Sequence, residues 1–207
     1  MVLLLCLLFL TALTLLGLSA SADAVLQNQL AANLQESERT KQAALAALSW
    51  AEDWLLDLQG PAPESCTTPC EGFRLHPAGD LPPHPEFEDL SWWQTQGYEA
   101  GVDPLTGNRL VTIGASSIDP PMWVIEVLHE RPAAGDGTTD SPIDALADPP
   151  ADIQAWYHIL ARASGQTDSV ISVVESIVTR SWLSAEESSD ESTGSAGKGR
   201  VSWRELR

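Results

Sequence analysis

The N-terminal 58 residues constrain the fold of this chain more than any other feature. Met1 to Ala22 carries no charged side chain, and Asp23 to Leu58 contains neither Pro nor Gly. Ala, Leu, Gln and Glu dominate the second stretch, and these residues are acceptable or good helix formers. One continuous helix over both stretches would be about 85 Å long, at 1.5 Å per residue. The sequence therefore predicts a helix that runs from a bilayer or an apolar assembly to a folded head.

The first 22 residues have two possible roles. As a helix they would span about 33 Å, close to the roughly 30 Å hydrocarbon core of a bilayer, which suits a retained anchor. Alternatively, Ala20-Ser21-Ala22 fits the small-x-small site where a secretory signal peptide is cleaved. The cleaved product would be a soluble periplasmic binding module, with residues 23–58 as an ordinary amphipathic helix. Either role calls for positive side chains before the apolar run, and the sequence shows none there.

An apolar stripe marks the C-terminal part of the predicted helix. Its members recur at spacings of four and three, so they share one helical face, which we expect to pack on a β-sheet. The chain then divides into a transmembrane part (1–22), an amphipathic part of the same helix beyond the membrane (23–58) and a β-rich head (59–207), with Gly60-Pro61 ending the helix. The stripe consists of Ala44, Leu48, Ala51, Leu55 and Leu58, and Leu26, Leu30 and Leu34 form an earlier stripe.

Strand-like segments occupy the second half of the chain. β-branched and aromatic residues alternate there with polar ones, a pattern typical of half-buried antiparallel strands. Segments rich in Pro, Gly, Ser and acidic residues predict loops at 59–91, 132–152 and 184–199, the last of them disordered. The predicted fold class is α+β, a long N-terminal helix packed on an antiparallel sheet. The expected strands are Arg109–Ile113, Met122–Leu128, Trp156–Ala163, Val170–Arg180 and a short Val201–Trp203.

The net charge narrows the range of partners. Eleven Lys and Arg stand against 29 Asp and Glu, which gives −18 at pH 7. Such a surface repels phosphate backbones and anionic headgroups, so nucleic acid is not an expected partner and membrane contact requires a hydrophobic segment. Eight Trp side chains offer large areas for burial. We expect Trp50 and Trp54, four apart on the helix, to cap the core of the head rather than to contact another protein.

The three cysteines fall into two groups. Cys6 lies in the apolar run and acts there as a small hydrophobic residue. Cys66 and Cys70 are separated by three residues in a proline-rich connection, and in an exported protein such a pair predicts a disulfide loop. Two free thiols are the alternative. A redox motif would have two intervening residues rather than three.

The polar residues predict no catalytic, cofactor or metal site, so we expect a protein that is not an enzyme. Nothing in the sequence places the helical acids in a cleft. The histidines lack the third and fourth ligands that a zinc site needs, and an aspartate turn lacks the distal Glu of an EF-hand. We expect Glu36, Glu38, Glu52 and Asp53 on the solvated helix face, His76, His84 and His158 at the surface, and Asp103, Thr106 and Asn108 in a plain turn.

The ordered series of segments resembles the PilX-type minor pilins of type IV pili. The resemblance is good over Leu3–Leu58, fair over parts of the head and absent from Gln59–Leu90. The series is more specific than the helix pattern alone, because Ala- and Leu-rich helices are common. The segments that carry it are Leu13–Ala20, Leu26–Leu34, Gln42–Leu48 with Ala51-Glu52, Trp123–Glu126, Tyr157–Gly165 and Arg200–Glu205.

The resemblance implies a single-pass inner-membrane protein with a periplasmic head, which later joins a pilus near its tip. It implies that the protein supports pilus assembly with other minor and major pilins and a PilY-type adhesin, and hence twitching motility or adhesion. The apolar helix would contact lipid first and the helices of neighbouring subunits in the filament afterwards. The residues expected to make these contacts are Leu3, Leu7, Leu10, Leu13 and Leu16.

Two features depart from the pilin pattern. Pilins begin with a basic leader ending in Gly, which a prepilin peptidase removes, and the sequence shows no such leader; we expect the reading frame upstream of Met1 to encode one. Major pilins also carry Glu at the fifth mature position, whereas Val2–Leu7 contains no acid. The K-type pseudopilins of type II secretion share this lack and are the alternative family, although they carry a larger inserted helical domain.

Overall fold

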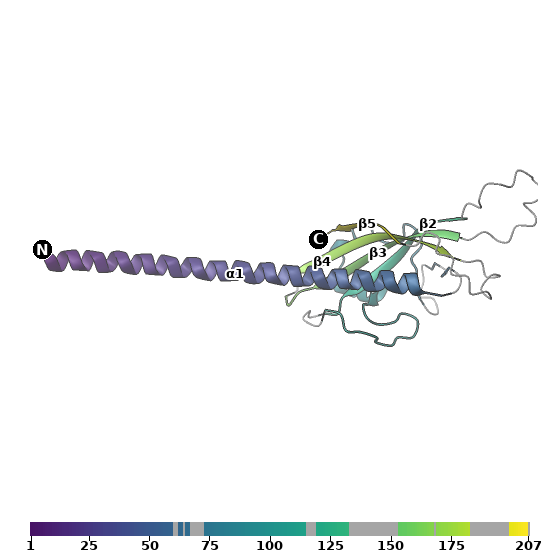
Figure 1. Cartoon of the computed structure of the whole chain (residues 1–207), viewed down its shortest axis with the longest axis horizontal. Helices are drawn as coiled ribbons and strands as arrows, with labels where there is room; N and C mark the ends of the chain where they lie inside the picture. Colours follow the sequence, from purple (N-terminus) through teal and green to yellow (C-terminus); the bar gives the residue numbers. More distant parts are fainter. Residues whose placement is uncertain are drawn as a thin grey trace, which may run out of the picture.

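The computed structural model of this chain describes residues 1–59, 62–63, 65–66, 73–114, 119–132, 153–167, 169–182 and 199–206. A 56-residue helix, α1 (Val2–Asp57), extends from a head built on an antiparallel sheet (Figure 1). The predicted α+β fold, a long N-terminal helix packed on an antiparallel sheet, is confirmed. This is the arrangement that the resemblance to pilins implies.

The sheet is an antiparallel meander with the strand order β1-β2-β3-β4-β5. Strands that follow one another in the chain are neighbours in the sheet, so every connection joins adjacent antiparallel strands. The central pair, β3 and β4, stays in register along its whole length. The strands are β1 (Tyr98–Glu99), β2 (Met122–Pro132), β3 (Ile153–Ser164), β4 (Ile171–Trp182) and β5 (Gly199–Glu205).

The last turns of α1 lie on one face of this sheet. Ala44, Leu48, Ala51 and Leu55 have no exposed surface, and they form one core with inward-facing side chains of β2, β3 and β4. Leu58, the fifth residue of the stripe, follows the end of α1 as its C-cap and is half-buried against the same core. The spacing of four and three therefore corresponds to the buried face of the helix.

A second, smaller core lies on the other face of the sheet. The helix α2 (Leu90–Gln96) covers this face, following the 3-10 helix Pro85–Phe87. The strands of the sheet are therefore not half-buried, as their alternation predicts, but buried on both faces where α2 covers them. The seven residues of α2 are too few to show a helical period, and Asp89 begins the helix by accepting a hydrogen bond from the Trp92 amide. The second core consists of Trp93, Met122, Val124, Leu160 and Val173.

Three segments of the head differ from the sequence-based expectation. Residues 109–113 form no strand, because the Leu110 and Val111 amides both donate to the Gly101 carbonyl and close a turn instead. The segment 59–91, expected to be a loop, contains the 3-10 helix and the start of α2. The strand β5 begins at Gly199, the last residue of the loop expected at 184–199, whereas 133–152 and 183–198 lie outside the described residues.

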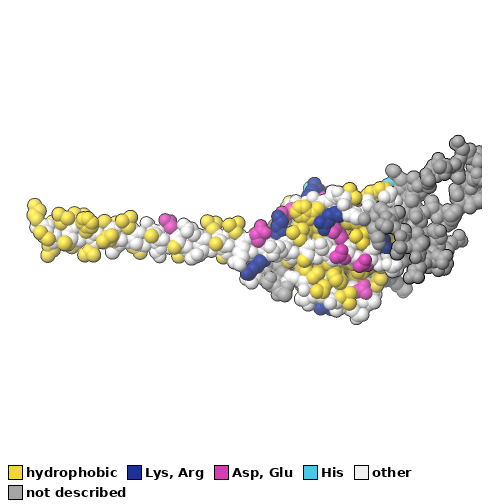
Figure 2. All heavy atoms as spheres, viewed as in Figure 1, with side chains coloured by type: hydrophobic (Ala, Val, Ile, Leu, Met, Phe, Trp, Pro, Cys, Tyr) yellow, Lys and Arg dark blue, Asp and Glu magenta, His cyan; other side chains and the backbone are white. Residues whose placement is uncertain are grey.

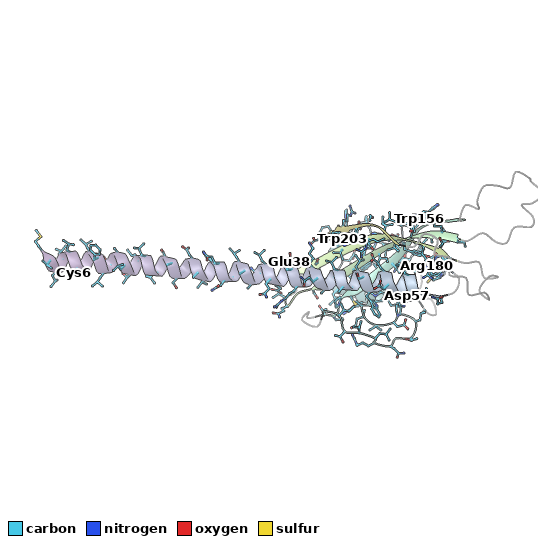
Figure 3. The ribbon with its side chains drawn as sticks, in the orientation of Figure 1. Cys6, Glu38, Asp57, Trp156, Arg180 and Trp203 are labelled. Carbon is cyan, nitrogen blue, oxygen red and sulfur yellow. The ribbon has the colours of Figure 1, made fainter. Side chains whose placement is uncertain are left out.

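The N-terminal part of α1, residues 2–35, projects from the head, and we call it the arm. All of its described side chains are exposed. Cys6 lies near the free end of the arm and Glu38 where the helix meets the head, while Asp57 and Arg180 lie at the opposite end of the head (Figure 3). The arm and the head thus offer two different kinds of surface.

Candidate functional site

The arm exposes many apolar side chains. Its length and composition are those of a helix that could cross a membrane, and none of its most apolar window is buried in the head. Side chains on the head are of mixed polarity, whereas those on the arm are largely hydrophobic (Figure 2). Asp23 is the one charged residue between Val2 and Gln35. The residues expected to contact lipid or neighbouring helices, namely Leu3, Leu7, Leu10, Leu13 and Leu16, are all exposed on the arm.

Hydroxyl groups in the arm form hydrogen bonds within the helix. The Thr11 and Thr14 hydroxyls donate to backbone carbonyls three residues earlier, at 2.8 and 2.9 Å. Ser19 does the same at 3.3 Å. Such bonds lower the cost of placing a hydroxyl in an apolar environment. These three polar residues are therefore compatible with lipid or with a packed helical core.

A second exposed stripe lies closer to the head. Leu26, Leu30 and Leu34 are 58%, 63% and 68% exposed, and their spacing of four places them on one side of the helix. From Val2 to Gln35 the arm is about 51 Å long at 1.5 Å per residue, whereas a hydrocarbon core is about 30 Å thick. If residues 1–22 span a bilayer, this second stripe lies outside it. These three leucines then lie outside the hydrocarbon core and can be buried only against another protein.

A hairpin turn is hydrogen-bonded to α1 where the arm leaves the head, and we call this junction the neck. The carboxylate of Glu36 accepts hydrogen bonds from the Gln166 and Thr167 amides, at 2.8 and 3.0 Å, and from the Thr167 hydroxyl at 3.3 Å. These residues belong to the turn between β3 and β4. Glu36 is therefore half-buried and satisfied by the turn. The expectation that it is simply solvated is wrong, because its partners are 130 residues away in sequence.

The turn approaches the helix so closely that a side chain on Gly165 would displace side chains of α1. A Cβ atom on Gly165 would lie 2.7 Å from Glu36 Oε1 and 3.0 Å from Thr40 Oγ1. The Thr40 hydroxyl is itself held by the Glu36 carbonyl at 2.9 Å. The Gly165 amide donates to the Val170 carbonyl at 2.7 Å and closes the turn. The neck thus fixes the direction in which the arm leaves the head.

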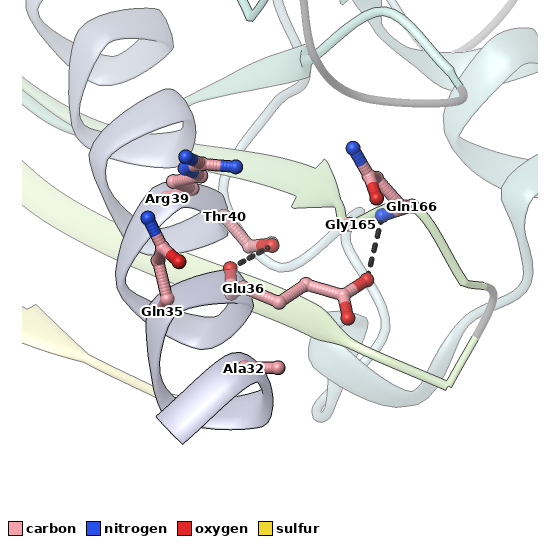
Figure 4. Close-up of a pocket in the computed structure, with 7 residues that line it drawn as sticks. All are labelled: Ala32, Gln35, Glu36, Arg39, Thr40, Gly165 and Gln166. Carbon is pink, nitrogen blue, oxygen red and sulfur yellow. Dashed lines mark hydrogen bonds between the residues drawn. The ribbon is translucent and has the colours of Figure 1, made fainter. Parts of the chain in front are cut away.

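A small hollow opens at the neck beside these contacts. It lies between α1 and the turn (Figure 4). Arg39 lines it from the helix and makes no hydrogen bond or ion pair with any described residue. The hollow is lined by Ala32, Gln35, Glu36, Arg39, Thr40, Gly165 and Gln166.

The opposite end of α1 is held by a buried arginine. Arg180, on β4, donates to the Leu55 and Leu58 carbonyls at the end of the helix. A cation in this position satisfies unpaired carbonyl groups and interacts favourably with the helix dipole. Its guanidinium group also lies 3.8 Å from the ring centroid of Trp182, whose indole N–H donates to the Tyr157 hydroxyl at 2.6 Å. Both ends of the head portion of α1 are therefore attached to the sheet.

The edge strand β5 is tied to the side of α1 by ion pairs. Glu52, only 7% exposed, accepts hydrogen bonds from the Arg200 guanidinium at 2.8 and 3.1 Å. Lys41 pairs with Glu205 at 2.6 Å. The expectation that Glu52 lies on a solvated face is wrong, because β5 returns beside the helix and covers it. Glu38 and Asp53 are exposed, as expected.

His158 lies in a polar network on the sheet face away from α1. Its ring nitrogens lie 2.8 Å from Glu175 and 3.5 Å from Glu126, and Arg204 also pairs with Glu175. Burial by itself lowers the pKa of His158, but the two carboxylates outweigh it, so this pKa lies above its ordinary value. The expectation of an exposed His158 is wrong, because its partners come from neighbouring strands.

His76 is also buried rather than at the surface. It is 3% exposed, and its ring lies 2.7 Å from Asp80 and 3.2 Å from the Gln96 carbonyl. Its backbone pairs with β2, donating to Ile125 and accepting from Val127. His84, in contrast, has a side chain that is 72% exposed. The segment around His76 thus covers part of the outer edge of β2, which a loop composition does not predict.

Aromatic rings cluster where α1 ends. Phe73 lies 4.4 Å from Trp54 and 5.1 Å from Tyr98, measured between ring centroids, and Trp123 contacts all three rings. The Trp54 indole N–H donates to Asp103 at 3.2 Å. Trp50 and Trp54 both pack against the main core, so the expectation that they cap it is confirmed.

The Asp103 turn needs no bound ion to satisfy its carboxylate. Asp103 accepts hydrogen bonds from the Thr106 hydroxyl at 2.6 Å and from the Leu105 amide at 3.1 Å, and the Asn108 carbonyl accepts one from the Asp103 amide at 2.9 Å. These bonds and that from Trp54 lower the pKa of Asp103, and partial burial opposes them. The structure therefore shows a turn at these residues, closed by its own hydrogen bonds.

The cysteines differ in state. Cys66 is disulfide-bonded, and Cys6 is free and exposed on the arm. Cys70 lies outside the described residues, so its pairing with Cys66 stays a prediction. Within the described part of the chain, no three His, Cys, Asp or Glu side chains are grouped so that they could hold a metal ion.

Among the residues that the structure describes, the apolar arm and the neck are surfaces that another molecule could cover. The head holds α1 through the neck, Arg180 and the ion pairs of β5. Comparison of the chain with protein-family models, curated proteins and solved structures gave no match.

Proposed function

We propose that this chain is a membrane-anchored subunit of a type IV pilus-like filament, acting as a minor pilin that supports pilus assembly and hence motility or adhesion. The arm would hold it in the inner membrane with its head in the periplasm, and a prepilin peptidase would process it. On extraction, the arm would pack beside the helices of other minor and major pilins, with a PilY-type adhesin as a further tip partner. The role is structural and requires no catalysis.

The observation that carries this proposal is the exposed stripe of Leu26, Leu30 and Leu34. A bilayer whose hydrocarbon core covers residues 1–22 leaves this stripe outside that core, and the head does not cover it. Full burial of one leucine side chain is worth about 1.5–3 kcal/mol, so three leucines give a substantial driving force for helix packing. Helices of neighbouring subunits would supply such a surface, as they would for the more N-terminal leucines.

A soluble module cleaved after Ala22 fits this observation less well. Its helix would begin at Asp23 and would still project from the head to Gln35, with three leucines exposed. Isolated helical segments of this length are marginal in water unless they pack on something. A K-type pseudopilin would use the same arm, so only the identity of its partners distinguishes that alternative.

The stripe can be tested without disturbing the membrane-spanning part. A variant carrying Leu26→Gln, Leu30→Gln and Leu34→Gln should remain in the inner membrane but lose about tenfold or more of its incorporation into sheared filaments. A matched control, Ala24→Gln with Ala31→Gln, alters the arm away from the stripe and should incorporate normally. Quantitative immunoblots of the membrane and filament fractions give both numbers. Unchanged incorporation of the leucine variant would contradict the proposal.

A further inference from the structure

We propose that the hollow at the neck receives a carboxylate from a different filament subunit, which pairs with Arg39. This inference rests on the proposed function and adds the chemistry of one contact. The residues that carry it are Arg39 and its neighbours in the hollow, Gln35 and Gln166 (Figure 4).

Arg39 is unusual among the basic residues of this chain. The other Lys and Arg side chains that the structure describes all interact with neighbouring groups, among them Lys41 with Glu205 and Arg200 with Glu52. Glu36, three residues before Arg39, would be its natural ion-pair partner on a helix. The turn between β3 and β4 holds the Glu36 carboxylate instead. Although the chain has 29 acidic residues, Arg39 lies beside the hollow without an ion-pair partner among the described residues.

Arg39 provides donors for a carboxylate at the hollow, and the Glu36 carboxylate that also lines it already accepts hydrogen bonds from the turn through Oε1. A guanidinium group can donate two parallel hydrogen bonds to a carboxylate, which gives both strength and orientation. The side-chain amides of Gln35 and Gln166 provide further donors at the same hollow. An ion pair that a docking head shields from water is worth more than one on an open surface.

Two other sources of the anion are disfavoured by position and by charge. Arg39 lies 17 residues beyond Ala22, about 25 Å along the helix, so it is too far from the bilayer for an anionic headgroup if residues 1–22 span it. A second copy of this chain also carries a net charge of −18, and two such heads repel each other. The expected source of the carboxylate is therefore a different pilin subunit, with an acidic residue that lies beside Arg39 in the filament.

The hollow and the leucine stripe would serve different neighbours. At 100° per residue, Arg39 lies on the opposite side of α1 from Leu26, Leu30 and Leu34. A subunit whose helix covers the stripe therefore does not also fill the hollow. The chain would sit between two neighbours, one bound through apolar contacts along the arm and the other through the neck.

Zero-length cross-linking can identify the partner residue directly. In Arg39→Lys, a carbodiimide should join the new amine to an Asp or Glu of another pilin-like subunit in sheared filaments, and mass spectrometry should identify that residue. The Lys41–Glu205 pair, at 2.6 Å, should cross-link within the chain in every sample and serves as the internal control. Gln42→Lys places an amine at an exposed position of α1 outside the hollow and should give no intermolecular link.

Assembly provides a second readout that does not depend on cross-linking yield. Arg39→Glu should reduce incorporation into filaments about tenfold, whereas Arg39→Lys and Gln42→Glu should retain it. A link from position 39 to a second copy of this chain, or normal incorporation of Arg39→Glu, would overturn the inference. The proposed function would survive that result, because it is tested separately by the leucine variant and by the presence of the unaltered chain in filaments.

Discussion

Three residues outside the apolar stripe hold the two ends of the head portion of α1. Glu36 and Gly165 form the neck, and Arg180 holds the carbonyl groups at the far end of the helix. None of them is recognisable from sequence, because each acts through partners more than 120 residues away. Periodicity along one segment predicts which face of a helix is buried, but it contains no information about which distant polar group will meet that face.

Gly165→Ala should destabilise the head. The new methyl group would lie 2.7 Å from Glu36 Oε1, closer than real Cβ contacts, and 3.0 Å from Thr40 Oγ1, so Glu36 would have to shift and its hydrogen bonds to the turn would be disturbed. We expect a loss of about 1–3 kcal/mol in the free energy of unfolding, measured by chemical denaturation of the full chain in detergent. Gly199→Ala is the matched control, because a Cβ there meets no atom within 4 Å. Equal stability of the two variants would show that the neck is not tightly packed.

Leu55→Ala tests the buried stripe itself. Leu55 has no exposed surface and lies in the main core, so the substitution should cost about 2–5 kcal/mol. Leu30→Ala removes the same atoms from an exposed position on the arm and should leave the unfolding of the head unchanged. Thermal unfolding of both variants in the same detergent compares them, and an unaltered melting temperature for Leu55→Ala would contradict the packing described.

His158 predicts a pH dependence of stability. Its pKa is raised, so its contribution is present below the unfolded value of about 6.5 and is lost as the pH rises through the folded value. The pKa of Glu126 is lowered: burial opposes this, but hydrogen bonds from His158 and the Gly79 amide prevail. Its contribution is therefore present above about 4.5 and is lost on acidification through the folded value.

The two groups together should make this network most stabilising between about pH 4.5 and 6.5. His158→Gln should remove the loss of stability above that range, whereas His84→Gln, at an exposed side chain, should leave the pH profile unchanged. Denaturation midpoints measured from pH 4 to 9 test this. A profile of His158→Gln that runs parallel to that of the unaltered chain would show that the network does not titrate in this way.

At the scale of elements, long segments could be predicted and short ones could not. The helix α1 is predictable because 56 residues of helix formers contain one glycine and no proline. The strands β2, β3 and β4 lie where β-branched and aromatic residues alternate, although each continues past its predicted C-terminal end and β3 also begins earlier than predicted. The short helix α2 was missed, and with it the burial of the second face of the sheet, because seven residues carry too little periodicity.

Arg180 links the end of α1 to β4, so its removal should destabilise the whole last turn of α1. Arg180→Met keeps the apolar stem but leaves the buried Leu55 carbonyl without this donor, which should cost about 1–3 kcal/mol. Arg204→Met breaks an ion pair at an exposed position of β5 and should cost less than about 1 kcal/mol. Hydrogen exchange of the last turn of α1 should rise in the first variant only. Equal protection in both would exclude a capping role for Arg180.

At the scale of the whole molecule, the head is suited to water, whereas the long arm is suited to an apolar environment. The head buries two cores, whereas the arm exposes leucines from Leu3 to Leu34. The ion pairs of β5 and the neck hold the helix to the sheet, so the arm leaves the head in a fixed direction. A chain of this shape is expected to be stable only where lipid or other helices cover the arm.

The most direct test of the central claim is to determine where the intact arm is found. Cells that produce the chain from its own locus are separated into periplasmic, inner-membrane and sheared-filament fractions, and the mature N-terminus is determined by mass spectrometry. We expect the chain in the inner membrane and in filaments, with the apolar residues that precede Asp23 retained. A soluble periplasmic protein that begins at Asp23 and is absent from filaments would contradict the account.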